Sequence, residues 1–289
     1  MEKLTFINSK GDTIIFEEKE PFLLQSIDGV EATDVTNQSQ RVPFQDGEIP
    51  LDTLIEPRII SLTVMLLANS SAELKDYRRK LISVLNPKLG EGRLLYENNG
   101  DVKEISAKIE QMLSFPSGKD NKGTNFQTTI FSFRCSNPYW TDETDTKASL
   151  AAYRESLTLP FTLPAVLGVE GESAVIFNDG DVDTPLEIEL HGPSINPVIE
   201  NKTTGKLIKV NRELEKGDIL YINTDKGKDK KVEIQKADGT IENAFHWLDI
   251  FESSLFELVP GENYLSYYAD VGTEDAVVNI KYRNRYVGM

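Results

Sequence analysis

The sequence predicts a mainly β protein with two domains and one well-marked helix. Three features of the 289 residues lead to this prediction. Short apolar or alternating runs recur between clusters of turn residues, which is the pattern of β-strands. A single segment combines a helix cap with apolar residues at helical spacing. A polar, acidic stretch followed by Pro160 and Pro164 interrupts the strand pattern once. We therefore expect a first domain over 1–141, a linker over 142–160 and a second domain over 161–289.

The first domain is expected to consist mostly of strands. The longest runs from Arg58 to Leu67; it alternates apolar with polar residues at its centre, and its other face is apolar near both ends. A strand of this kind is covered on both sides. Asn98-Asn99-Gly100 provides the positive φ angles that a tight hairpin turn needs. The predicted strands are Leu4–Ile7, Thr13–Phe16, Arg58–Leu67, Arg93–Glu97, Val102–Ile109 and Phe126–Cys135.

The helix is predicted over residues 71–85. Ser70-Ser71-Ala72-Glu73 forms a capping box, in which the Ser70 hydroxyl accepts from the Glu73 amide and the Glu73 carboxylate reaches back. Pro87 ends the helix, because proline lacks a backbone donor and disfavours helical geometry in the residue before it. Five side chains at helical spacing form the apolar stripe: Leu74, Tyr77, Leu81, Val84 and Leu85.

The second domain is expected to be almost wholly β. Turn clusters such as Asn178-Asp179-Gly180 and Lys216-Gly217-Asp218 separate short strands at regular spacing. Closely spaced short strands favour a β-sandwich over a parallel α/β sheet. The predicted strands are Ala174–Phe177, Leu186–Leu190, Pro197–Glu200, Lys206–Val210, Ile219–Ile222, Lys231–Gln235 and Ala276–Tyr282.

The composition is strongly acidic. There are 47 Asp and Glu residues against 31 Lys and Arg, a formal net charge of −16. Binding to nucleic acid or to anionic membranes relies on clustered basic residues, so both functions are disfavoured. No apolar run reaches the roughly 18–20 residues that a membrane span needs. Met1 to Asp12 lacks the basic start and apolar run of a secretory signal, so no such signal is expected.

The sequence contains few residues that could carry catalysis or bind metal. There are no phosphate-binding glycine loops, HExxH, CxxC or Gly-x-Ser-x-Gly motifs. Cys135 could act as a nucleophile with His191 or His246, but its alternation with Phe131 and Phe133 favours an inert core thiol. We expect no catalytic residue, no metal and no cofactor.

Two weaker possibilities concern the acidic residues. The stretch from Asp179 to Asp183 begins like a calcium loop, but Thr184 stands where glycine is required and Leu190 where the closing glutamate belongs. A glycosidase pair of carboxylates is open in principle, although 47 acids bring some pair to the right separation by chance. Neither changes the expectation that the protein is not an enzyme.

Aromatic residues of the second domain offer a possible sugar-binding surface. Trp247, Tyr264, Tyr267 and Tyr268 have flat faces on which a sugar could stack, although aromatic residues are more often core. His246 and Trp247 are the candidate glycan contacts. The apolar neighbours of His246 favour a hydrogen-bonded structural histidine as the alternative.

Several short motifs occur in order across both halves of the chain. The first half contains Pro57-Arg58 at the start of the longest strand and, at its end, Phe133-Arg134-Cys135-Ser136-Asn137-Pro138-Tyr139-Trp140. The second half contains Asn178-Asp179-Gly180-Asp181, Asn196-Pro197-Val198-Ile199-Glu200-Asn201, Leu258-Val259-Pro260-Gly261-Glu262-Asn263 and Tyr286-Val287-Gly288. Together these segments resemble the distal tail proteins of long, flexible-tailed bacteriophages that infect Gram-positive hosts.

This resemblance implies a fold and an assembly. It implies an N-terminal β-barrel or sandwich-like domain with the one helix, which forms a hexameric ring, and a C-terminal galectin-like β-sandwich. The ring would be the hub of the tail tip in the virion, made in the host cytoplasm and without membrane contact. Its implied partners are the tail tube protein, a tail-associated lysin or tail fibre hub protein, and a receptor-binding protein.

The helix is the expected ring interface within this picture. Its apolar stripe suits a clamp on its own sheet or on a neighbour's, and the candidate contacts are Leu74, Tyr77, Arg78 and Leu81. DNA would be a transient cargo in the lumen, because six copies at −16 each give a wall of −96 that does not hold phosphates. The alternative function is a carbohydrate-binding module, in which the second domain contacts the host cell wall.

Overall fold

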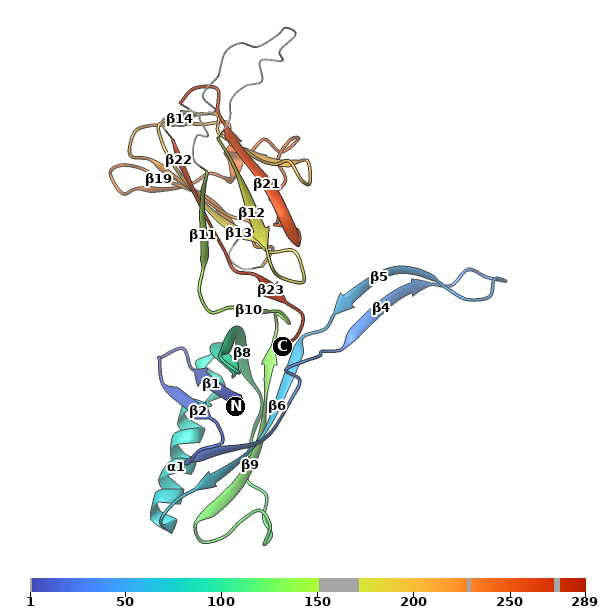
Figure 1. Cartoon of the computed structure of the whole chain (residues 1–289), viewed down its shortest axis with the longest axis vertical. Coiled ribbons are helices and arrows are strands. Elements are labelled where there is room, and N and C mark those ends of the chain that lie inside the picture. Colours follow the sequence, from blue (N-terminus) through green and yellow to red (C-terminus); the bar gives the residue numbers. More distant parts are fainter. Residues whose placement is uncertain (1, 151–171, 228–229, 273–275) are drawn as a thin grey trace. The chain divides into compact units, whose positions relative to one another are not determined.

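The computed structural model describes residues 2–150, 172–227, 230–272 and 276–289. These residues form two compact units (Figure 1). The first unit contains the chain up to Glu143 together with Tyr286–Met289, and the second contains Thr144–Arg285. Within the described residues there is one α-helix, and all other regular elements are strands or short 3-10 turns. The predicted mainly β fold with one helix is confirmed.

The first unit is built on a nine-stranded sheet. Its main path runs β2-β1-β7-β8-β9-β6-β3, with β10 and β23 added at one side. The two end strands come together, because the Leu24 amide donates to the Glu17 carbonyl oxygen at 2.9 Å. The sheet therefore curls toward a barrel around an apolar core. The strands are β1 (Glu2–Ile7), β2 (Thr13–Phe16), β3 (Phe22–Asp28), β6 (Arg58–Leu67), β7 (Gly92–Asn98), β8 (Asp101–Ser114), β9 (Phe126–Cys135), β10 (Trp140–Asp142) and β23 (Arg285–Tyr286).

Helix α1 (Ser71–Val84) covers this core, followed by the 3-10 turn η1 (Pro87–Leu89). The Glu73 amide donates to the Ser70 hydroxyl at 3.2 Å, as the capping box predicts. The Glu73 carboxylate reaches one residue further back than predicted and accepts from the Asn69 amide at 2.8 Å. Leu85 is the C-cap, so the helix ends one residue before the predicted boundary.

The hairpin between β7 and β8 follows its turn signal. Asn99 and Gly100 both have positive φ, at 52° and 90°, as a two-residue hairpin loop requires. β8 continues to Ser114, five residues beyond the predicted end at Ile109. The alternation of buried and exposed side chains stops at Ile109, because the pairing with β9 shifts register there and the next three residues are exposed.

The second unit is a two-sheet sandwich. One sheet has six strands in the order β11-β22-β13-β18-β19-β20, and the other has four in the order β12-β21-β15-β16. Buried side chains from both sheets share one core, which confirms the predicted sandwich. The elements are β11 (Thr146–Leu150), β12 (Glu172–Asn178), β13 (Leu186–His191), β15 (Val198–Asn201), β16 (Lys206–Lys209), β18 (Ile219–Asn223), β19 (Lys231–Gln235), β20 (Ile241–Asn243), β21 (Gly261–Tyr268), β22 (Val277–Tyr282), the pair β14 (Ser194–Ile195) and β17 (Glu213–Leu214), and the 3-10 turn η2 (Phe245–Trp247).

Part of the predicted linker is a strand. Residues Thr146–Leu150 form β11, which pairs antiparallel with β22 at the edge of the six-stranded sheet. Only Leu150 is buried there, so the segment has no apolar alternation by which a strand could be recognised. The rest of the predicted linker, 151–160, lies outside the described residues.

Cys135 at the end of β9 is fully buried, and burial raises the pKa of its thiol to about 12. We therefore predict that Cys135 does not react with a thiol reagent in the folded protein at pH 8, where only about one molecule in 10⁴ carries the thiolate. One equivalent should react once the protein is unfolded in guanidinium.

A Ser83→Cys variant provides the control, because Ser83 is exposed on α1. It should label with one equivalent in the folded state. Rapid native labelling of the parent protein would contradict the buried position of Cys135.

Candidate functional site

A long two-stranded arm extends from the first unit (Figure 1). We call residues 34–56 the arm; the Glu56 amide closes its base by donating to the Asp34 carbonyl oxygen at 2.9 Å. Its strands β4 (Val35–Gln40) and β5 (Ile49–Ile55) pair with each other and with no other strand of the described residues. The arm is thus a hairpin that its own subunit does not cover.

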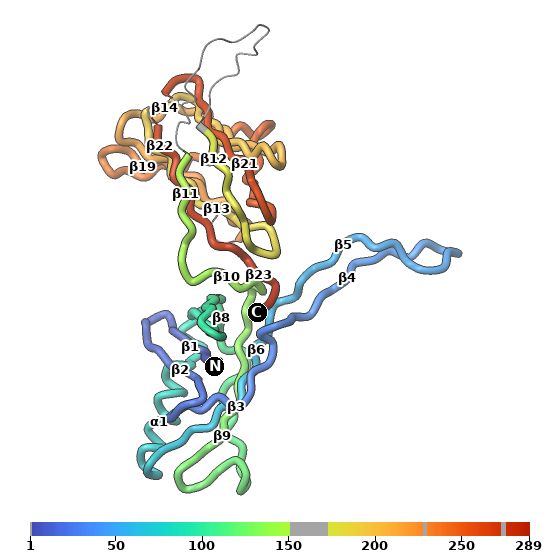
Figure 2. The backbone as a smooth tube through the Cα atoms, viewed as in Figure 1, coloured from blue at the N-terminus to red at the C-terminus, as the bar shows by residue number. Residues whose placement is uncertain are grey.

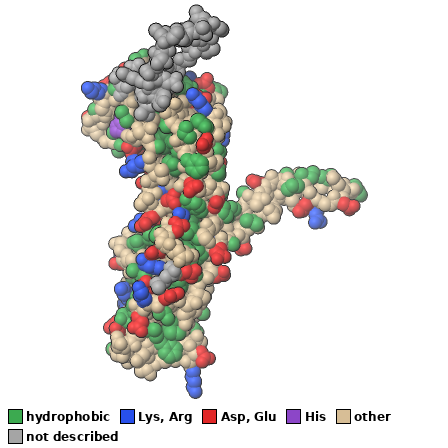
Figure 3. Space-filling view, in the orientation of Figure 1, with side chains coloured by type: hydrophobic (Ala, Val, Ile, Leu, Met, Phe, Trp, Pro, Cys, Tyr) green, Lys and Arg blue, Asp and Glu red, His purple; other side chains and the backbone are tan. Residues whose placement is uncertain are grey.

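The arm has no core. Every residue of β4 and the first six residues of β5 are exposed. An isolated two-stranded hairpin is at best marginally stable in water, and clustered exposed apolar side chains mark interaction surfaces. Hydrophobic side chains gather along one side of the arm in Figure 3. Six large apolar residues of the arm are at least 40% exposed: Val35, Val42, Phe44, Ile49, Leu51 and Leu54.

No strand was predicted in the arm. Its strands are exposed on both faces, so no apolar and polar alternation develops, and a bulge breaks the little that exists. Asp52 pairs with Gln38 and Pro50 with Ser39, which leaves Leu51 without an opposite residue. The sequence offered one sign of the arm: isolated apolar residues recur in an otherwise polar segment, without the spacing of a helix or a strand.

We call the base of the arm, together with the chain segments that bind Arg58, the root. Arg58 holds these segments together. Its side chain is fully buried, and its guanidinium donates to five backbone carbonyl oxygens. Burial lowers the pKa of this guanidinium, because desolvation disfavours its charge. The acceptors lie just before the arm, after β9 and in the C-terminal tail: Gly29 at 2.7 Å, Val30 at 2.9 Å, Ala32 at 3.2 Å, Pro138 at 3.0 Å, and Val287.

Trp140 and the C-terminal tail complete the root. The buried Trp140 donates its indole N–H to the Val30 carbonyl oxygen at 3.1 Å. Arg58 donates to the same oxygen, so Val30 accepts from both residues. The C-terminal end of the chain lies beside the base of the arm (Figure 2). Any Cβ at Gly288 would meet the Glu31 carbonyl oxygen at 2.0 Å, so only glycine permits this approach. Tyr286 binds the Asp142 carboxylate through its hydroxyl at 3.2 Å.

The predicted helix contacts divide into two pairs. Leu74 and Leu81 are 7% and 0% exposed and pack in the core of their own unit, because that side of α1 covers the sheet. Tyr77 and Arg78 are half-buried. Tyr77 donates to Glu73 at 2.6 Å, and the Arg78 guanidinium lies 4.3 Å from the centre of the Phe115 ring. Of the four predicted contacts, only this second pair is partly exposed.

The two predicted glycan contacts, His246 and Trp247, lie beside each other and next to Arg212. The Arg212 guanidinium lies 4.8 Å from the centre of the Trp247 ring, and the His246 ring lies 4.7 Å from it. His246 is exposed. Tyr267 belongs to the core. A cavity of about 300 Å³ nearby has mostly apolar walls, formed by Lys230, Phe245, Leu248, Ile250, Ser253 and Leu255.

The structure offers little for catalysis. Within the described residues, no three His, Cys, Asp or Glu side chains are grouped to hold a metal ion. The raised pKa of Cys135 leaves it protonated at neutral pH, so it is a poor nucleophile. No helix among these residues has the length and apolar character to cross a membrane. The arm and its root are the candidate functional site.

Two family models match the chain. Residues 9–135 match the phage tail protein RIFT-related domain, and residues 179–286 match the C-terminal domain of the siphovirus-type tail component. The first match contains the arm, and the second covers most of the sandwich unit and ends at Tyr286, one residue beyond it. No curated protein sequence matches the chain.

Solved structures share the fold over the whole length. The SPP1 Dit (gp 19.1) protein, described as a paradigm of the hub adsorption apparatus in phages infecting Gram-positive bacteria, aligns with a TM-score of 0.69 and 12% identity over 98% of both chains. A chain of the phage P2 baseplate in its activated conformation with Ca aligns with a TM-score of 0.51 and 12% identity, over 100% of this chain and 99% of that one. The same baseplate with Sr gives the same score and identity over both full chains.

The root generates a stability prediction. We expect Arg58→Met to lower the free energy of unfolding of the first unit by roughly 3–5 kcal/mol, because buried carbonyl groups lose their donor. Arg58→Lys should lose less, since an ammonium group still donates up to three hydrogen bonds. Urea unfolding measures both.

Arg41→Met is the matched control, because the Arg41 side chain is 84% exposed. It should change stability by no more than about 0.5 kcal/mol. Equal stability of the Arg58→Met and Arg41→Met variants would show that the root does not depend on the guanidinium.

Proposed function

Because the chain belongs to the distal tail proteins of siphoviruses, we propose that six copies close into a ring at the tip of the phage tail. As a member of this family it is a structural component of the tail and its baseplate hub. The ring would join the tail tube to the adsorption apparatus of a phage or prophage of a Gram-positive host.

The arm is the observation that carries this proposal. A ring forms when one surface of a subunit binds a different surface of the next and the rotation closes. The arm supplies such a surface, since it reaches beyond its own unit and exposes six large apolar side chains. Burying the exposed part of each side chain contributes about 1 kcal/mol or more. Because the contact repeats at every junction, the closed ring gains it six times.

The two units suit different partners. The first unit, which carries the arm, would form the ring and bind the tail tube protein on one side and a tail-associated lysin or tail fibre hub protein on the other. The second unit has a core of its own, so it could carry a receptor-binding protein without disturbing the ring. The partners are assigned on the family relationship.

DNA is proposed to pass through the lumen as transient cargo. The net charge of −16 per copy supports this role, because an acidic wall does not retain phosphates. The alternative function is a cell-wall carbohydrate module, which the Arg212 guanidinium over the Trp247 ring disfavours because it occupies a place where a sugar would stack.

The mass of the purified protein in solution tests the ring directly. Light scattering behind size exclusion should give a particle of about 194 kDa, six times the 32.4 kDa chain, or twice that for two stacked rings. A mass of 32.4 kDa that persists up to high micromolar concentration would contradict the ring.

A second prediction concerns the apolar residues of the arm. The double variant Leu51→Asp, Leu54→Asp should remain folded, because both side chains are exposed, but it should stay monomeric, because the charges would have to be buried at each junction. Light scattering together with circular dichroism measures both properties.

Val175→Asp is the control, since Val175 is 57% exposed but belongs to the second unit. The Val175→Asp variant should assemble into the ring as the parent protein does. A normal ring from the Leu51, Leu54 double variant would remove the arm from the interface.

A further inference from the structure

The outer face of α1 carries unpaired positive charge. Lys75, Arg79 and Ile82 are exposed and lie at i, i+4 and i+7, so they share one stripe on the side away from the core. Neither Lys75 nor Arg79 forms an ion pair with any described residue. The helix as a whole has four basic residues against two acidic ones, in a chain of net charge −16. This is a basic surface on an acidic protein.

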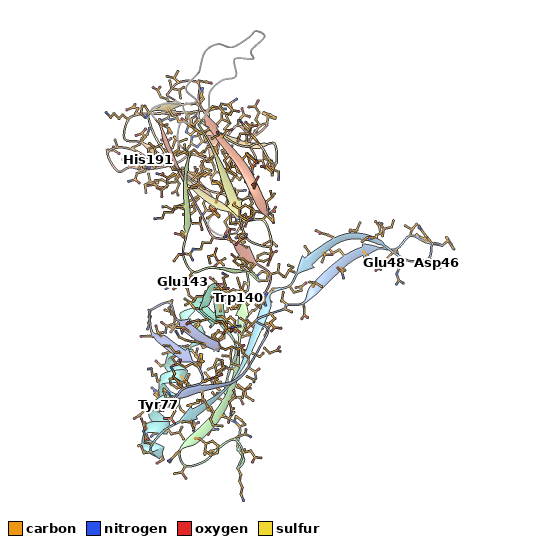
Figure 4. The ribbon with its side chains drawn as sticks, in the orientation of Figure 1. Asp46, Glu48, Tyr77, Trp140, Glu143 and His191 are labelled. Atoms are coloured by element: carbon orange, nitrogen blue, oxygen red, sulfur yellow. The ribbon has the colours of Figure 1, made fainter. Side chains whose placement is uncertain are left out.

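The arm has the opposite charge. Residues 34–56 contain five acidic residues and one basic residue, Arg41. Asp46 and Glu48 lie near its tip, as Figure 4 shows. Glu48 is 3.9 Å from Arg41, whereas Asp52 has no ion-pair partner among the described residues. The arm therefore presents several carboxylates that nothing in its own subunit neutralises.

One face of the arm combines its acid with apolar side chains. The register pairs Asp52 with Gln38, Leu54 with Thr36 and Ile49 with Gln40, so the three β5 side chains point to the same side. Leu54 is 44% exposed and Ile49 is 48% exposed. On the helix, Lys75 and Arg79 lie beside Ile82, which is 40% exposed. The two surfaces thus match in both charge and apolar character.

The lengths of the two surfaces also match. The 14 residues of α1 extend about 21 Å at 1.5 Å per residue. The seven residues of β5 extend about 23 Å at 3.3 Å per residue. The arm points away from the helix of its own unit in Figure 1, so it cannot lie along that helix. A second copy can supply the helix.

We propose that the arm of one copy lies along the outer face of α1 of the next copy, with Asp52 against Lys75 and Arg79 and with Leu54, two residues further along β5, against Ile82. This contact rests on the proposed ring and specifies its junction. It uses exposed residues of the helix, whereas Leu74 and Leu81 are committed to the core. The occupant of the basic face is therefore a second copy of this chain.

A charge exchange tests the contact. Arg79→Glu alone and Asp52→Lys alone should each raise the protein concentration at half-assembly at least tenfold, because each places like charges across every junction. The double variant, Arg79→Glu with Asp52→Lys, should lower it again at least threefold below either single variant, because the pair between positions 52 and 79 is restored with reversed sign while Lys75 keeps its charge. Light scattering over a dilution series measures the half-point, and circular dichroism confirms that each variant is folded.

Lys80→Glu is the matched control. Lys80 is exposed on the same helix but lies about 100° around it from Arg79, so it is outside the stripe. It should shift the half-point by less than about threefold. Single reversals at Arg79 and Asp52 that assemble like this control would overturn the contact while leaving the ring intact. Loss of assembly in both single variants without recovery in the double variant would also overturn it. A parent protein that never assembles would instead refute the ring itself.

Discussion

The buried guanidinium of Arg58 is the constraint on which the functional part of the first unit depends. A charge inside a protein is tolerated only when its hydrogen-bonding groups are satisfied, and here all five acceptors are backbone carbonyl oxygens. They come from the segment before the arm, from Pro138 and from Val287 in the C-terminal tail. Each of these segments must keep its position for the charge to remain satisfied. The arm therefore leaves a rigid root, although it has no core of its own.

In the proposed ring, this arrangement would separate folding from assembly. The core of the first unit and the Arg58 network stabilise the subunit, whereas the apolar residues of the arm contribute little until a second molecule covers them. Exposed apolar hairpins are usually a liability, because they promote aggregation. The carboxylates of the arm would reduce that risk, because like charges repel wherever a basic partner surface is missing. The same charges give the proposed junction its specificity, since only a basic, partly apolar surface of similar length satisfies them.

Caps and turn residues predicted the elements whose ends depend on a few neighbouring residues. Ser70, Glu73 and Pro87 mark the ends of α1, and Asn99-Gly100 marks a turn that needs two positive φ angles. Strands buried on one face are visible because alternation follows burial. β6 is an example, since one of its faces is buried and the other is exposed or half-buried, not covered as predicted. The arm, β11 and the end of β8 were missed for the same reason, since their side chains are mostly exposed and burial imposes no pattern on them.

The sequence by itself determined the fold class, the helix, most strands of both units, the acidic charge and the motif residues Arg58 and Trp140. It did not determine what these two residues do. Only the tertiary structure brings both onto the carbonyl oxygen of Val30, which is 110 positions from Trp140, and brings Val287 to Arg58 across 229 positions. It also decided that Leu74 and Leu81 face inward and that the arm stands free. The physical reason is that propensity and periodicity act over a few residues, whereas satisfying a buried charge depends on the path of the whole chain.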